Sequence, residues 1–254
     1  MEPGEHSQLV LPPEPGRVFV QAMRPGLADC APSGRIRLDA LARWQQDIAY
    51  ADVEDAGLAH SAVWVVRRTR LRVIRFPRFA ERCTLRTCCS GLGRMWAERR
   101  TTITRAGASR SEVEAVSLWV HLDPASRRPT PFDEAELAAY ADAAQGRRVI
   151  AHLRHPSPGE ARRISRWTFR STERDIAGHI NNAAYWQPLE EELLARPEDP
   201  AGLDAEIEFR TPAQPGEKAV LGEGQRRWIV GAEGGEVHAS MAVSLGGDED
   251  PGAA

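Results

Sequence analysis

The sequence has little net charge, few cysteines and no long apolar run, and each of these shortages excludes a class of protein. The formal net charge is −3, so electrostatics give no reason to expect nucleic acid or an anionic membrane as a partner. Of the four cysteines, Cys88 and Cys89 are adjacent and none forms a C-x-x-C pair, which suits neither a metal site nor a disulfide framework. No stretch of about 18 apolar residues occurs, which excludes a membrane-spanning helix.

The amino terminus also lacks the features of a secretory signal. Its sequence, MEPGEHSQLVLPPEPG, is acidic and proline-rich, with neither a basic region nor an apolar core. We therefore expect a cytoplasmic protein with reduced cysteines. Residues 1–16 and 246–254 have the composition of disordered tails, and we expect the folded part to lie between them.

The first half of the folded part, 17–122, changes its hydrophobic period once. A short apolar run at 18–23 is typical of a strand, and residues 38–55 carry apolar side chains at spacings of three and four, followed by Gly57. Four segments with strand-like patterns follow within 62–122. This order predicts an α+β domain in which one long helix packs on an antiparallel sheet.

The second half repeats the order of the first. Residues 123–163 are rich in proline and include a helical pattern at 133–144, so we interpret them as a connector with a short helix. Residues 164–245 then give a strand, a helix and further strands. An offset of 144 places Gly34 on Gly178, and an offset of 135 places Arg75 on Arg210. Two like domains in one chain favour a pseudo-dimer whose sheets join edge to edge.

One stretch of the second half has the composition of a catalytic site. Asp175, His179, Asn181 and Asn182 fall within eight positions, directly before a helical pattern. A carboxylate can activate water or attack a carbonyl, and the N–H groups at a helix start favour developing negative charge. The alternative is that an asparagine only caps the helix and that His179 only shapes the loop.

Two further features carry predictions of their own. Pro188 removes a helical N–H, so we expect a kink or break in the helix there. Arg67, Arg68, Arg70 and Arg72 form a basic run on a predicted strand. This run is either a solvated strand face or a surface for an acidic partner.

The motifs resemble those of the acyl-acyl-carrier-protein thioesterases of plants and bacteria. The residues that carry the resemblance are DIAGHINNAAYW at 175–186, IEFRTP at 207–212, and the segments 34–49, 64–82 and 96–100. The resemblance implies two tandem hotdog domains, each a long helix packed on an antiparallel sheet, that form a pseudo-dimer. It implies hydrolysis of fatty acyl-acyl-carrier-protein in fatty acid biosynthesis, without a metal or an organic cofactor. An acyl-CoA thioesterase and a non-catalytic acyl-binding hotdog protein are the alternatives.

The resemblance also implies roles for individual residues, with the second domain supplying the chemistry and the first forming most of the acyl pocket. The implied catalytic residues are Asp175, His179 and Asn181, and the candidate substrate-binding residues are Asn182, Tyr185, Glu191, Trp44 and Trp64. The expected partners are the fatty acyl thioester and acyl carrier protein, and the chain is expected to be a monomeric pseudo-dimer or a homodimer. The sequence departs from the family in two ways: Ala177 stands where the family has asparagine, and Pro212 and Ala213 stand where it has an acidic residue, often followed by cysteine. The sequence therefore predicts either catalysis with a reduced set of groups or an inactive relative.

Overall fold

The structure is a computed structural model that describes residues 9–11 and 13–246. One antiparallel sheet holds ten strands in the order β1-β3-β4-β5-β2-β7-β10-β9-β8-β6. The strands are β1 (Phe19–Met23), β2 (Val63–Val73), β3 (Cys83–Leu92), β4 (Trp96–Arg105), β5 (Val113–Leu122), β6 (Arg162–Phe169), β7 (Gly202–Phe209), β8 (Gly216–Glu223), β9 (Arg226–Gly231) and β10 (Val237–Gly246). Most of the predicted tails, 1–16 and 246–254, lies outside the described residues.

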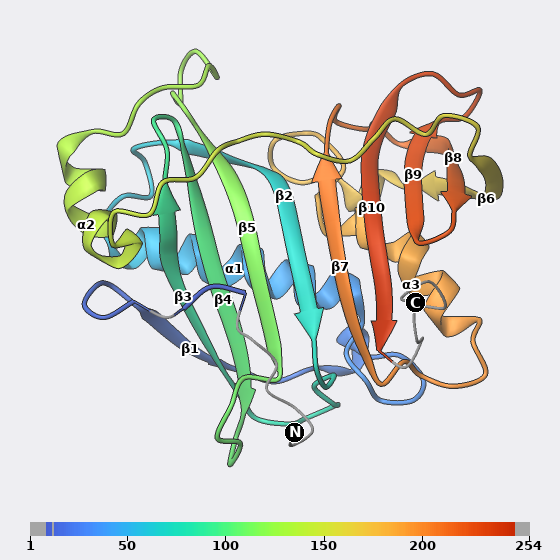
Figure 1. Cartoon of the computed structure of the whole chain (residues 1–254), viewed down its shortest axis with the longest axis horizontal. Helices are drawn as coiled ribbons and strands as arrows, with labels where there is room; N and C mark the ends of the chain where they lie inside the picture. The colour runs from blue at the N-terminus through green and yellow to red at the C-terminus, as the bar shows by residue number, and fades with distance from the viewer. Residues whose placement is uncertain (1–8, 12, 247–254) are drawn as a thin grey trace, which may run out of the picture.

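The long helix of the first half, α1 (Leu38–Asp55), has the predicted bounds. Its buried face includes Leu38, Leu41 and Ile48, which are fully enclosed and each contribute about 1.5–3 kcal/mol through burial. The helix lies across one face of the sheet (Figure 1). It ends at Asp55, two residues before Gly57, whose φ of 74° is the left-handed conformation that favours glycine.

The corresponding helix of the second half is shorter and is interrupted where the proline predicts it. A 3₁₀ turn, η3 (Ala184–Trp186), leads into α3 (Gln187–Leu194), so Pro188 stands in the first turn of α3. An N–H at that position has no partner inside a helix, and proline is tolerated there. The predicted break is therefore confirmed.

Strand order and register establish the internal repeat. The first half has the order β1-β3-β4-β5-β2, and the second half has the equivalent order β6-β8-β9-β10-β7. The halves join where β2 pairs with β7. The register of this pairing has the symmetry that the predicted offset of 135 requires. The offset relates Arg68 to Leu203 and Val73 to Glu208, and the strands pair Arg68 with Glu208 and Val73 with Leu203. The predicted α+β fold, two tandem hotdog domains forming a pseudo-dimer, is confirmed.

Ion pairs across this junction account for most of the basic run on β2. Arg70 and Arg72 both contact Asp204 of β7, at 2.8 and 2.9 Å, and Arg68 lies 3.7 Å from Glu206. Burial raises the pKa of Asp204, but its hydrogen bonds to the two guanidinium groups outweigh this and lower it overall. These arginines therefore serve the contact between the halves.

The connector contributes a helix and a crossing segment. The predicted helix is α2 (Glu134–Ala144), and its first turn is closed reciprocally, because Asp133 accepts from the Glu136 N–H and Glu136 accepts from the Asp133 N–H. The chain then crosses the sheet face opposite α1 to reach β6 (Figure 1). Within the described part of the chain, no helix has the length and apolar character needed to cross a membrane.

Candidate active site

The site is built on a loop that the fold uses twice. The 3₁₀ turns Leu27–Asp29 and Ser171–Glu173 are related by the offset of 144, as are the bridges Cys30↔Ile36 and Arg174↔Ile180. Gly34 and Gly178 occupy equivalent places, with φ of 86° and 80°, where a side chain would be strained. The backbone is thus the same in both copies, and any difference between them comes from the side chains.

The second copy of the loop, 171–182, opens onto a cavity between the two halves. This cavity has a volume of about 490 Å³. Asp175, Asn181 and Asn182 belong to its wall. Nearly all other lining residues come from the first half and the connector: Gln46, Ala49, Tyr50, Val53, Ala59, Ala62, Val63, Trp64, Cys89, Leu92, Ala97, Glu98, Arg99, Trp119, Arg127, Phe132, Glu136 and Tyr140. One half therefore supplies the loop and the other supplies most of the enclosure.

Hydrogen bonds fix the polar side chains of the loop. Asp175 Oδ1 accepts from the Ala177 N–H at 2.9 Å. Asn181 Oδ1 accepts from the N–H of Ala183 at 2.8 Å, while Nδ2 donates to Gln46 Oε1 of α1 at 3.0 Å. Asn181 is thus a capping residue and a link between the halves at once. The side chain of Asn182 has no hydrogen-bond partner among the described residues, and it borders this cavity and a second one of about 10 Å³.

The backbone of the loop leaves one donor beside the cavity. Gly178, Ile180 and Asn181 donate their N–H groups to carbonyls of Asp175, Ala213 and Glu173, respectively. Within the described chain, the N–H groups of His179 and Asn182 have no acceptor. Because Asn182 borders the cavity and directly precedes the helical turns, its N–H is placed to meet negative charge.

The first copy of the loop shows what this N–H position can bind. Leu38, the equivalent of Asn182, donates its N–H to Glu190 Oε2 at 3.0 Å. The other oxygen of Glu190 lies 2.8 Å from Arg35 Nη1, and Arg35 also pairs with Asp199 at 2.9 Å. The side chains of Arg35 and Glu190 are 1% and 4% exposed. In this copy the protein itself therefore places an anionic oxygen on the equivalent N–H, and a buried ion pair fills the position.

Several predicted site residues lie away from the cavity wall. His179 is exposed and its ring makes no hydrogen bond to a described residue. Glu191 is exposed on α3. Trp44 is 4% exposed and packs in the core. Burial raises the pKa of Tyr185 to about 12, and its hydroxyl accepts from the Ala213 N–H at 2.8 Å, so this residue shapes the loop. Of the two tryptophans proposed for the acyl pocket, only Trp64 lines this cavity.

Other lining residues could not be singled out from the sequence. Gln46 accepts a hydrogen bond from Asn181, which is 135 positions away in the sequence, and so helps to hold the loop. Arg99 carries a recognisable signal, because strand alternation places it on the same face of β4 as the buried Ile103. A charged side chain on the inward face of a strand indicates a buried partner or a ligand.

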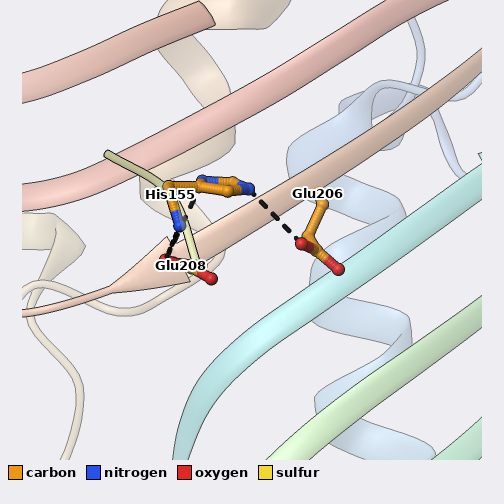
Figure 2. A group of neighbouring side chains, drawn as sticks. All are labelled: His155, Glu206 and Glu208. Carbon is orange, nitrogen blue, oxygen red and sulfur yellow. Dashed lines mark hydrogen bonds and ion pairs between the residues drawn. The ribbon is translucent and has the colours of Figure 1, made fainter. Parts of the chain in front are cut away.

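One group of side chains outside the cavity has the composition of a metal site. His155 of the connector approaches Glu206 and Glu208 on the sheet face opposite α1 (Figure 2). His155 Nε2 lies 3.3 Å from Glu206, and Glu208 accepts the N–H groups of Arg154 and His155 at 2.5 and 3.0 Å. These partners provide the two carboxylates with hydrogen-bonding and ionic contacts from the protein itself. The group ties the connector to β7.

Comparisons with known proteins agree with this architecture. The sequence model of the acyl-ACP thioesterase N-terminal domain matches residues 16–140. The uncharacterized protein Rv2001 of Mycobacterium tuberculosis strain H37Rv is 26% identical over 214 residues, or 84% of this chain and 85% of that protein.

Two crystal structures share the fold across both halves. A candidate oleoyl thioesterase from Lactobacillus plantarum superposes with a TM-score of 0.73 at 20% identity, over 91% of this chain and 95% of that one. An acyl-ACP thioesterase from Bacteroides thetaiotaomicron gives 0.72 at 15% identity, over 90% and 97%. At such low identities these likenesses establish the fold alone.

Proposed function

We propose, because the chain belongs to the acyl-ACP thioesterase family, that it releases free fatty acid from acyl-acyl-carrier-protein in fatty acid biosynthesis. Family membership makes the chain a thioesterase that acts on acyl thioesters. The preference for a carrier protein over coenzyme A and the place in fatty acid biosynthesis belong to the proposal. The roles of individual residues are also part of the proposal.

The observation that carries the proposed site is the contrast between the two loops. The Leu38 N–H holds a carboxylate oxygen of Glu190 in the first copy. Asn182, whose unpaired N–H is the equivalent donor, borders a cavity large enough for a ligand of ordinary size. We assign Asn182 the role of donor to the thioester carbonyl oxygen as it becomes an oxyanion. Such donors typically contribute about 10²–10³ in rate.

Asp175 is the carboxylate that the loop presents to the cavity. In the proposed reaction it takes a proton from water while the water oxygen attacks the thioester carbonyl carbon. The tetrahedral intermediate then expels the carrier thiolate, which accepts a proton, and leaves the free acid. Asn181, held by Gln46, fixes the helix start from which Asn182 donates. This reduced set needs neither an asparagine at Ala177 nor an acid at Pro212.

Thiol release from acyl-carrier-protein and acyl-CoA panels tests the proposal. We expect purified protein to release thiol from acyl-carrier-protein with a higher kcat/KM than from acyl-CoA of the same chain length. Equal or better hydrolysis of acyl-CoA would support the coenzyme A alternative. Binding of acyl groups without any thiol release would support a non-catalytic acyl-binding protein.

The edge strand β6 offers the surface on which an acidic carrier protein could dock. Arg162, Arg166 and Arg170 are exposed along β6 and the start of the catalytic loop. Within the described chain, the one ion pair of these three side chains is a long contact of 3.7 Å from Arg166 to the exposed Glu217. Unlike the arginines of β2, this row therefore remains available to a negatively charged partner.

Reversing the charge of these arginines separates carrier recognition from chemistry. We expect Arg162→Glu, Arg166→Glu and Arg170→Glu together to raise KM for acyl-carrier-protein by about tenfold at low salt, because electrostatic attraction is lost. Hydrolysis of acyl-CoA is expected to stay within about twofold. The control is Arg110→Glu, an equally exposed reversal in the turn between β4 and β5. Equal effects on both substrates would refute the docking surface.

A further inference from the structure

The guanidinium group of Arg99 lies on the cavity wall and has no role in the proposed hydrolysis. Arg99 of β4 lines the cavity with a side chain that is 11% exposed. Its Nη1 contacts Asp52 Oδ2 at 2.6 Å and Thr87 Oγ1 at 3.3 Å. Within the described part of the chain, its Nε and Nη2 groups donate to no acceptor. The guanidinium therefore retains donor capacity at the wall of a cavity expected to hold a hydrocarbon chain.

The charge of Arg99 is already balanced inside the protein. Asp52 is 1% exposed and pairs with both Arg99 and Arg17, at 2.6 and 2.7 Å. Arg17 also pairs with Asp55 at the surface. Two guanidinium groups thus face two carboxylates, which leaves no excess charge for an anionic ligand. The remaining donors suit a neutral oxygen such as a hydroxyl or keto group.

A second polar group on the same wall also lacks a partner. Tyr140 of α2 is 6% exposed and lines the cavity, with the Arg99 guanidinium carbon 5.6 Å from its ring centre. Its hydroxyl has no partner of good hydrogen-bond geometry among the described residues. Burial raises the pKa of Tyr140, and the adjacent Arg99 guanidinium offsets part of that rise. An unpaired buried hydroxyl costs about 1–3 kcal/mol. The adjacent Arg99 and Tyr140 are therefore placed to share one ligand oxygen, which would remove that cost.

Helix α1 contacts both this polar wall and the reactive loop, and the spacing of the two contact positions indicates how far apart the regions lie. Asn181 contacts Gln46 and Arg99 contacts Asp52. Six residues separate the two positions on α1, which corresponds to about 9 Å along the helix axis. An oxygen that meets Arg99 would therefore lie well along the acyl chain, beyond the carbons next to the thioester.

We infer that the preferred substrate is an acyl thioester whose chain carries a hydroxyl or keto oxygen well away from the thioester, recognised by Arg99 and Tyr140. The inference rests on the proposed hydrolysis and names its substrate class. A plain chain would leave the guanidinium donors facing hydrocarbon and the neighbouring Tyr140 hydroxyl without a well-placed partner. An oxygenated chain would satisfy them.

Matched substrate pairs test the inference. Hydroxylated and plain acyl-pantetheine thioesters of equal chain length are compared, with the hydroxyl at mid-chain, at the terminal carbon or at the third carbon. We expect kcat/KM to favour a mid-chain or terminal hydroxyl by at least about tenfold over the plain chain. The third-carbon hydroxyl should give no preference, because it lies too close to the thioester. A preference for plain chains of every length would overturn the inference.

Substitutions then test which residues recognise the oxygen of the acyl chain. Tyr140→Phe keeps the ring and is expected to reduce the preference to within about threefold, and Arg99→Lys is expected to weaken it. The control is Tyr50→Phe, which removes a hydroxyl from the same cavity at a residue that is 56% exposed, and it should leave the preference unchanged. An unchanged preference in both Tyr140→Phe and Arg99→Lys would refute the assignment.

A binding measurement keeps the inference separate from the proposed hydrolysis. If no thioester releases thiol, the proposed function fails. Equilibrium binding of hydroxylated and plain fatty acids, followed by the fluorescence of the cavity tryptophans Trp64 and Trp119, still decides the preference. Tighter binding of the hydroxylated acid, lost in Tyr140→Phe, is the expected result. Equal binding of both acids would refute it.

Discussion

Asp175→Asn is expected to lower kcat/KM for thioester hydrolysis by about 10²–10⁴, the range that general base catalysis contributes. An amide cannot take the proton of the attacking water. The substitution should preserve the loop, because the asparagine oxygen can still accept the Ala177 N–H that Asp175 now accepts at 2.9 Å. Initial rates of thiol release at matched substrate concentrations give the measurement, with a thermal melt to check folding.

Two comparison variants show whether the effect belongs to the site. Glu191→Gln also converts a carboxylate to an amide, but on the exposed side of α3, and should change the rate by less than about twofold. His179→Ala should cost less than about tenfold, because the ring is exposed and outside the cavity wall. A rate in Asp175→Asn within threefold of the wild type would refute the role of this carboxylate.

Arg35→Met is expected to destabilise the protein by about 3–5 kcal/mol, because it leaves a charged or newly protonated Glu190 buried without its partner. Arg35 is 1% exposed and contacts both Glu190 and Asp199. Burial raises the pKa of Glu190 even beside Arg35, so removal of the cation would favour its neutral form. Urea unfolding, followed by circular dichroism, measures the loss.

The double variant Arg35→Met, Glu190→Gln separates the ion pair from packing. Glutamine keeps an oxygen for the Leu38 N–H, so we expect the double variant to recover most of the loss. The double variant should retain catalysis, because the first copy of the loop, which contains Arg35, lies outside the reactive cavity. Additive losses from the two single changes would contradict a coupled pair.

Local patterns were enough to predict most of the fold. The period of three and four over 38–55 predicted α1 with its correct bounds, since an amphipathic face must be buried along its whole length. Pro188 predicted the break between η3 and α3 because proline lacks the N–H that a helix interior needs. The repeat offsets of 144 and 135 reappear in the loops and in the β2–β7 register.

The side-chain composition of the site could be predicted only in part. Asp175, Asn181 and Asn182 stood out because polar groups crowd one loop, and the structure brings them to the cavity. Gln46 acts through Asn181, a partner far away in sequence that no local pattern reveals. Strand alternation marks Arg99 as an inward-facing charge, but its partner Asp52 lies 47 positions away and is not indicated by that pattern. The exposed position of His179 depends on which side of the loop faces the cavity, and motif spacing does not determine that.

The two loops together explain how one duplicated unit gives a single open site. Both copies present the same N–H at the helix start. In the first copy, Glu190 occupies it and Arg35 neutralises the charge. In the second copy, Gln46 stands at the position equivalent to Glu190 and bonds Asn181. A neutral amide in place of a carboxylate therefore leaves the Asn182 N–H to a substrate.

We expect the acyl chain to lie among first-half residues while the second-half loop acts on the thioester. Photocrosslinking tests it most directly, with a diazirine-bearing acyl-pantetheine thioester bound to Asp175→Asn and the adducts mapped by mass spectrometry. We expect adducts on cavity residues of the first half, such as Tyr50, Val53 and Trp64. Adducts confined to second-half core residues, such as Trp167 and Phe209, would contradict the account.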